Sequence, residues 1–350
     1  LGKITHFQES HPVAVVAIFG FLTLAMLPGM GQIDTVVALE NMMPASSEPV
    51  QEFNQLRAEG SGRDTIAINI KTGISDEGVQ SVYDRKAREY IRQLRDRVKG
   101  IYGVETVYSP LQRESLVDGD KSNAVMIAYS YVGDDGKEMS RIFSEIKEEA
   151  SYQKPEGLTT SISGVPAVQQ RLASMVQRDK NVTTMFSLLL VFLITWPLFR
   201  GSLTAALMPL LIVALSVVWL YGTMGYLGIP LSTLAGSVAA LVIGIGIAYA
   251  IHIGNIYRFN RRDNTVKESL VDSMDDIGVS IIASAITTIS AFMAFLVGMM
   301  PEMHRFGIIM SLGIGYAALF TILLLPAVFV LEESMMAKIS ESLGWREDFP

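Results

Sequence analysis

Six long apolar runs alternate with polar segments along the chain. They lie at residues 12–27, 182–199, 202–229, 232–257, 278–300 and 306–331. Most of them reach or exceed the roughly 20 residues that cross the hydrocarbon core of a bilayer. The pattern therefore predicts a membrane α-helical bundle of six transmembrane helices, the later five of which occupy residues 181–332.

The first run is the shortest, and Lys3 precedes it, so a cleaved signal peptide is one alternative. The run ends in Leu27-Pro28-Gly29-Met30, which lacks a cleavage site of the small-x-small kind. We therefore interpret residues 1–33 as the amino terminus and an anchoring first helix.

One long polar stretch, residues 34–180, separates the first two runs and is too long to be a loop. Residues 65–70 alternate with period two and place Ile66, Ile68 and Ile70 on one buried face of a strand. Apolar residues at helical spacing predict amphipathic helices at 83–99 and around 139–146. Further strands are expected at 104–108, 123–131 and 158–163. The resulting βαββαβ order is that of an α+β ferredoxin-like fold, from which a helix at 166–178 leads into the membrane.

Cationic residues indicate the orientation in the membrane. The segment 258–277 is predicted to be a loop, and it contains Arg258, Arg261, Arg262 and Lys267. Short loops rich in Lys and Arg stay in the cytoplasm. This loop, both termini and a tail at 333–350 are therefore expected inside, and the domain at 34–180 is expected to be extracytoplasmic. Among the connections between the later helices, Arg305 is the one cation on the opposite side, close to the last outer turn.

Composition excludes several classes of protein. Half of the residues are apolar, mean hydropathy is +0.35 and only 18% are charged, which is unusual for a soluble protein. The net charge of −7 includes no basic block, so we expect no nucleic-acid partner. The chain has no cysteine, and its four histidines are scattered. No phosphate loop or nucleophile elbow is present, so we expect neither an enzyme, nor a metal site, nor a cofactor.

The fourth apolar run carries small residues at every fourth position, Gly236, Ala240, Gly244 and Ala248, with His252 next in the row. Such a row lets another helix approach closely, and it can equally mark the helix beside which a polar pathway runs. Ionisable or polar groups inside a membrane, here His252 and Tyr249, suggest function. Alternatively, His252 is hydrated at the interface near Arg258, and Tyr249 is a core aromatic.

On the fifth run, Ser284, Thr287 and Thr288 fall on one helical face and would form a hydroxyl-lined stripe. The alternative is that these hydroxyls only bond back to the preceding turn of their own helix.

Several short motifs follow one another along the chain. They are His11-Pro12, Met43-Pro44, Ser163-Gly164-Val165-Pro166, Phe199-Arg200-Gly201-Ser202-Leu203, Leu227-Gly228-Ile229-Pro230-Leu231-Ser232, Gly244-Ile245-Gly246-Ile247-Ala248-Tyr249-Ala250-Ile251-His252, Ser284-Ala285-Ile286-Thr287-Thr288, Phe306-Gly307 and Leu325-Pro326-Ala327. In this order they resemble the resistance-nodulation-division (RND) superfamily, in the branch that contains the MMPL proteins, the hydrophobe exporters and the Patched-like proteins.

The resemblance implies that residues 34–180 are a porter domain and that the membrane part moves lipids or other hydrophobic molecules, driven by a proton gradient. The transport and proton-relay candidates it suggests are Gly244, Gly246, Ala248, Tyr249, His252, Ser284, Thr287 and Thr288. It also implies a multi-pass protein of the cytoplasmic membrane.

Two departures from the family pattern change the expectation. The chain holds one six-helix repeat where relatives usually have two, so we expect either a half-transporter that forms a homodimer or a fragment. Ala248 stands where the family's fourth helix normally has an Asp proton carrier. We therefore predict that proton coupling is weak or absent, with any remainder running through His252. The alternative is a lipid- or sterol-sensing protein without transport; a subunit assisting protein translocation fits the fourth-helix pattern less well.

Overall fold

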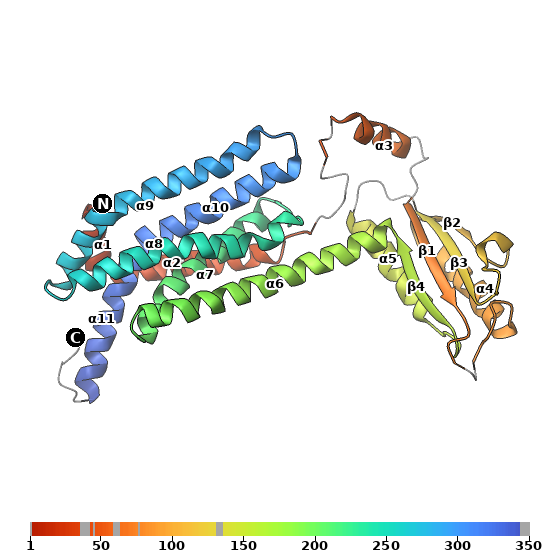
Figure 1. The fold of residues 1–350 in the computed structure, drawn as a ribbon, viewed down its shortest axis with the longest axis horizontal. Helices are drawn as coiled ribbons and strands as arrows, with labels where there is room; N and C mark the ends of the chain where they lie inside the picture. Colours follow the sequence, from red (N-terminus) through yellow and green to blue (C-terminus); the bar gives the residue numbers. More distant parts are fainter. Residues whose placement is uncertain are drawn as a thin grey trace. The chain divides into compact units, whose positions relative to one another are not determined.

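The structure is a computed structural model that describes residues 2–35, 43–44, 46–58, 64–75, 78–130 and 136–343. The chain divides into two compact units (Figure 1). One consists of Leu1–Val36 with Val176–Pro350, and the other of Val37–Met175.

The second unit is built on a four-stranded antiparallel sheet of order β2-β3-β1-β4. Its elements are α3 (Glu48–Ala58), β1 (Asp64–Lys71), α4 (Arg85–Lys99), β2 (Val104–Tyr108), η2 (Glu114–Leu116), β3 (Asn123–Ser130), α5 (Gly136–Ser151) and β4 (Thr159–Gly164). From β1 onward, the order of strands and longer helices is the predicted one. Helix α3 was not predicted, and position 131 lies outside the described residues.

One face of the sheet packs against α4 and α5 and forms the core of this unit. Ile66, Ile68 and Ile70 are 0–1% exposed, which confirms the face predicted from their alternation. Tyr90 of α4 donates its hydroxyl to the carbonyl of Ala150 in α5. Burial raises the pKa of Tyr90 to about 12, so this link between the two helices keeps its proton at neutral pH.

Helix α4 begins two residues later than the sequence pattern predicts. Asp84 precedes it, with its carboxylate accepting the backbone N–H groups of Gln80 and Ser81 at 2.8 and 3.0 Å. Asp84 therefore organises the turn before the helix rather than capping the helix itself.

The first unit is helical. Its elements are α1 (Gly2–Ser10), α2 (Pro12–Met30), α6 (Val165–Leu198, which begins in the second unit), α7 (Leu203–Tyr226), η3 (Leu234–Ser237), α8 (Val238–Asn260), α9 (Val266–Met293), η4 (Ala294–Val297), α10 (Pro301–Leu323) and α11 (Leu325–Leu343). Within the described residues, six helices are long and apolar enough to cross a membrane, so the chain is a multi-pass membrane protein.

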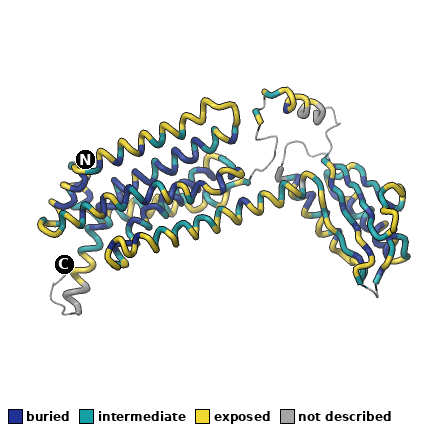
Figure 2. The backbone as a smooth tube through the Cα atoms, viewed as in Figure 1, coloured by how far each residue is buried: buried dark blue, intermediate teal, exposed yellow. Residues whose placement is uncertain are grey.

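Three of these helices form the centre of the helical unit. In the spans of α7, α8 and α10, 44–61% of residues are buried within the chain, against 6–11% in α2, α6 and α9 (Figure 2). The peripheral helices therefore present most of their apolar surface to the surroundings.

Glycines allow the closest helix crossing. A Cβ atom on Gly222 of α7 would lie 2.7 Å from the Cβ of Met26 in α2, and Gly29 meets Gly225 in the same crossing. Just beyond it, the amide of Leu231 donates to the carbonyl of Asp34 at 2.7 Å.

Two predictions for the helical unit are wrong. The segment 258–277 is not a loop, because α9 already begins at Val266, where Thr265 and Glu268 form a capping box. The apolar run 306–331 is interrupted near Leu324, since Pro326 has no N–H to give to the Ile322 carbonyl.

Helix α1 compensates for this interruption. The side-chain amide of Gln8, which is 2% exposed, donates to the carbonyls of Ile322 and Leu323 at 2.9 Å each. The amphipathic pattern did not predict α1 as an element. It is the tertiary partner that satisfies the backbone between α10 and α11.

Candidate functional site

The eight candidate residues lie on α8 and α9, but the predicted row of small residues does not pack against another helix along its whole length. Gly236 lies near Val176 of α6, with 3.4 Å between a Cβ built on the glycine and the valine Cγ1. At Gly244 no atom lies within 4 Å of such a Cβ. Ala248 is half-buried and His252 is exposed. From Gly244 onward the row therefore faces away from the chain's own helices.

A different row of α8 makes the close contacts. A Cβ on Gly246 would lie 2.7 Å from the Cβ of Ala317 in α10, and one on Gly254 would lie 3.6 Å from the ring of Phe329. Val242 fills the space above Gly313. Of the candidates on α8, Gly246 is thus a packing residue at the α8–α10 seam.

Tyr249 and His252 have different surroundings. Tyr249 is 6% exposed, and its hydroxyl has no hydrogen-bond partner in the part of the chain that the structure describes. A buried hydroxyl without a partner costs about 1–3 kcal/mol, so this group is available to a polar partner that enters the bundle. His252 is exposed on the outward row.

The hydroxyls of α9 are engaged with their own helix. Thr287 and Thr288 donate to the carbonyl of Ser284 at 2.9 and 2.8 Å, and Ser290 donates to Ile286 at 2.8 Å. This is the back-bonding alternative. No hydrogen bond joins these side chains to His252 among the described residues, so the structure does not assemble the candidates into one polar relay.

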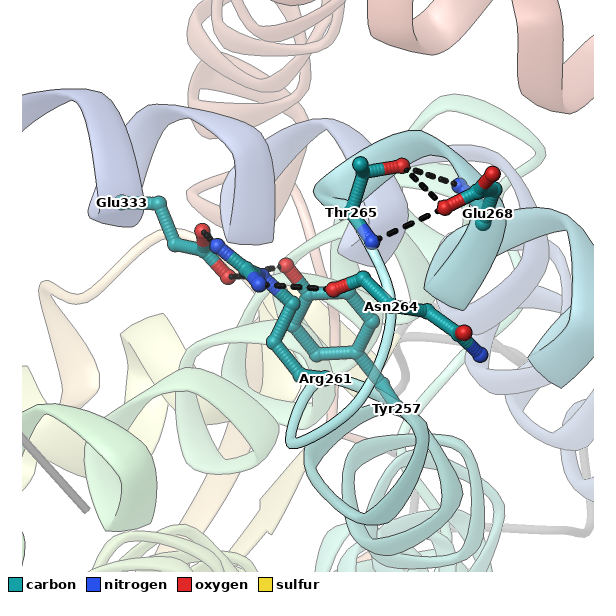
Figure 3. A network of polar contacts seen from close by, with 6 residues as sticks. All are labelled: Tyr257, Arg261, Asn264, Thr265, Glu268 and Glu333. Atoms are coloured by element: carbon teal, nitrogen blue, oxygen red, sulfur yellow. Dashed lines mark hydrogen bonds and ion pairs between the residues drawn. The ribbon is translucent and has the colours of Figure 1, made fainter.

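A polar network that the sequence analysis missed ties the end of α8 to α11 (Figure 3). The guanidinium of Arg261 donates to both carboxylate oxygens of Glu333 at 2.8–3.0 Å, and Tyr257 donates its hydroxyl to the same carboxylate. Arg261 also donates to the carbonyl of Asn264 at 2.8 Å. The hydrogen bonds to Glu333 raise the pKa of Arg261, so its guanidinium stays charged.

A second ion pair lies beside this network. Arg258 lies 3.5 Å from Glu332 and its guanidinium carbon is 5.5 Å from the centre of the Phe199 ring. The two glutamates directly after the apolar segment 325–331, together with two arginines spaced by three residues at the end of α8, were the sequence signal for this contact.

One carboxylate is buried at the opposite end of α8. Glu302, in the first turn of α10, is 7% exposed and accepts the backbone N–H of Leu234 at 3.3 Å. Among the described residues, no three His, Asp or Glu side chains gather where they could hold a metal ion.

Comparison with known proteins identifies the family of this chain. The sequence model of the MMPL family matches residues 41–347. The chain belongs to the MMPL family. The predicted resemblance is thereby confirmed, and so is the expectation that the protein is not an enzyme.

This MMPL protein has relatives of very different lengths. A membrane protein of Methanocaldococcus jannaschii is 26% identical over 95% of this chain and 94% of its own length. The sulfolipid-1 exporter MmpL8 of Mycobacterium tuberculosis is 20% identical over 91% of this chain and 30% of its own. The hopanoid transporter HpnN of Burkholderia multivorans is 24% identical over 56% of this chain and 22% of its own. The chain thus spans nearly all of the archaeal relative and less than a third of the two named transporters.

Proposed function

We propose that this MMPL protein is a half-size membrane transporter that exports lipids or other hydrophobic molecules. The observation that carries the proposal is membership of the MMPL family, together with relatives named as a sulfolipid exporter and a hopanoid transporter. The six apolar helices are in keeping with it, because cargo of this kind reaches the protein from the bilayer.

The proposal includes a homodimer. The row formed by Gly244, Ala248 and His252 faces away from the chain's own helices, and neighbouring α9 is 11% buried over its span. Small residues on an outward membrane face permit close approach of another helix. A second copy would meet the same face in a two-fold arrangement, which would place Gly244, Ala248 and His252 at the centre of the assembly.

The proposal also assigns residues 34–180 to an extracytoplasmic, ferredoxin-like porter domain. The strand order β2-β3-β1-β4 with two helices on one face supports the fold assignment. The cations at the α8–α9 connection, Arg258, Arg261, Arg262 and Lys267, support the cytoplasmic placement of that end. The chain runs from α2 into the sheet domain and from the sheet domain into α6, at the helix ends away from these cations, so this domain would lie outside the cytoplasm. The helices would span the cytoplasmic membrane.

Proton coupling is proposed to be weak or absent. Ala248 cannot carry a proton, and the hydroxyls of Thr287 and Thr288 donate to the carbonyl of Ser284 in their own helix. A histidine side chain can bind and release a proton, and His252 lies exposed on the proposed dimer face. Any remaining coupling would therefore run through His252.

Flux in proteoliposomes tests the function. A fluorescent lipid analogue would be followed under an imposed pH gradient in the wild type, Ala248→Asp and His252→Ala, with Val279→Ala on exposed α9 as a matched control. We expect gradient-independent flux in the wild type and a gain of proton dependence in Ala248→Asp. Strong proton-driven flux that survives His252→Ala and gains nothing from Ala248→Asp would contradict the proposed coupling.

A second candidate function is lipid or sterol sensing without transport, and the missing Asp at position 248 favours it. The same assay separates the two. Absence of flux under every gradient, together with saturable binding of the lipid analogue, would replace export with sensing.

A further inference from the structure

A groove opens on the outer surface of the helical unit, between α6, α7 and α11. Its volume is about 490 Å³, within the range of ligand-binding pockets. The residues that line it and matter here are Leu188, Thr204, Leu207, Leu211, Ala214 and Val328.

The groove follows the axis of α7. Thr204 and Ala214 are ten residues apart on that helix, which corresponds to about 15 Å. Apart from Thr204, the whole lining is apolar. Leu207 and Leu211 are 44% and 47% exposed, so the groove is open along its side. Because α6 and α7 are both long and apolar enough to span a membrane, the opening between them would face lipid hydrocarbon.

The turn that precedes Thr204, a residue at one end of the groove, carries a cation. This cation is Arg200, which lies in the turn from α6 to α7, four residues before Thr204. Its backbone is in the left-handed region, at φ 53°. The side chain of Arg200 is exposed and has no ion pair or hydrogen bond within the described part of the chain. The neighbouring cation Arg258 is instead engaged with Glu332 and Phe199.

We infer that the groove binds an anionic phospholipid, with one hydrocarbon chain lying along α7 and the phosphate paired with Arg200. Beyond the Thr204 hydroxyl the lining offers no partner to a polar ligand, and burying hydrocarbon against its apolar part costs no hydrogen bond. The free guanidinium at the polar end complements a phosphate, with which arginine makes bidentate hydrogen bonds. This binding requires only that the helices span a membrane, so it does not depend on transport.

Such a lipid would also explain how α6 stays beside α7 although the two helices leave a groove between them. Only 6% of the span of α6 is buried within the chain, and Leu188 of α6 lines the groove together with Leu211 and Ala214 of α7. A hydrocarbon chain between them would supply contacts that the protein alone does not make, so binding should stabilise the folded protein by mass action.

Native mass spectrometry of the full chain tests the inference. The protein would be released from nanodiscs containing equal amounts of phosphatidylglycerol and phosphatidylcholine. We expect retained phosphatidylglycerol, with loss of that lipid in Ala214→Trp, whose indole fills the groove. Arg200→Gln should lower the preference for phosphatidylglycerol about fivefold, the equivalent of about 1 kcal/mol for one cation at an anionic headgroup.

The controls separate the groove from the general membrane surface. Val279→Trp adds the same side chain on α9, where the valine is 65% exposed, and should retain the lipid as the wild type does. Far-ultraviolet circular dichroism checks that Ala214→Trp is folded, and Leu211→Trp serves as a second groove-filling variant.

Three results would overturn the inference. The first is retention of phosphatidylglycerol by both groove-filled variants. The second is equal retention of the two lipids by the wild type, which would show that charge plays no part. The third is a disulfide crosslink between two copies of Leu211→Cys, which would assign the groove to a second copy of the protein. The chain has no native cysteine, so any such crosslink must join the introduced residues.

Discussion

Replacing Gly246 with alanine should disrupt the seam between α8 and α10. The new Cβ would lie 2.7 Å from the Cβ of Ala317, whereas carbon atoms in contact are about 3.5–4.0 Å apart. The two helices would therefore have to separate by roughly 1 Å at this point. Both helices are central in the unit, with 56% and 61% of their spans buried, so the separation would disturb packing on several sides.

Overpacking of this kind costs about 1–3 kcal/mol. Gly244→Ala is the matched control, because it lies two residues away on the same helix and no atom is within 4 Å of its new Cβ. Both substitutions make the same gain in helix propensity, about 1 kcal/mol. In the monomeric protein, where no second copy lies against Gly244, the difference in stability between the two variants isolates the contact with Ala317.

Reversible unfolding in mixed detergent micelles, followed by circular dichroism, measures that difference. We expect Gly246→Ala to be less stable than Gly244→Ala by about 1–3 kcal/mol. The assignment of Gly246 as the packing residue and Gly244 as the outward one would be refuted if the two variants agreed within about 0.5 kcal/mol, the range of ordinary surface substitutions.

Three other predictions concern separate parts of the molecule. Gln8→Ala should destabilise the helical unit by about 1–3 kcal/mol, because the carbonyls of Ile322 and Leu323 lose their donor; unfolding in micelles measures this, and equal stability of Gln8→Ala and wild type would show that water satisfies these carbonyls. Asp84 has a pKa below its ordinary value of 3.8 because the backbone N–H groups of Ser81 and Gln80 donate to it, so its stabilising effect is full above pH 3.8 and is lost as the pH falls through the lowered pKa. Thermal unfolding of Asp84→Ala and wild type should therefore differ at pH 7 and converge in acid, and a difference that grows in acid would contradict the sign. A cysteine at position 122 should react with a membrane-impermeant thiol reagent in intact cells if residues 34–180 are extracytoplasmic, and labelling only after lysis would reverse the proposed orientation.

The strands and the helices α4 and α5 of the sheet unit were largely predictable, because alternation and helical spacing are both local patterns. Alternation placed Ile66, Ile68 and Ile70 on the buried face, and helical spacing located α4 and α5. The boundaries were less predictable. Asp84 turns its carboxylate toward preceding amides rather than toward the helix, a choice between two sets of nearby donors that composition does not decide.

The candidate site was predicted less well, because outward and inward faces of a membrane helix have the same composition. Lipid is as apolar as a protein core, so hydropathy does not separate Gly244 from Gly246. The hydroxyls of Thr287 and Thr288 likewise read as a polar stripe, although in the structure they bond to the carbonyl of Ser284.

The sequence by itself determined the solvent and the family of this protein. Long apolar runs allow no environment but a bilayer, and the ordered motifs belong to the MMPL family. Only the tertiary structure decided which residues meet. Gln8 reaches carbonyls more than 300 positions away, and Arg261 pairs with Glu333 across 72 positions. Such contacts depend on which helices pack against one another. Because the apolar surfaces of these helices are similar, local sequence patterns do not determine that packing.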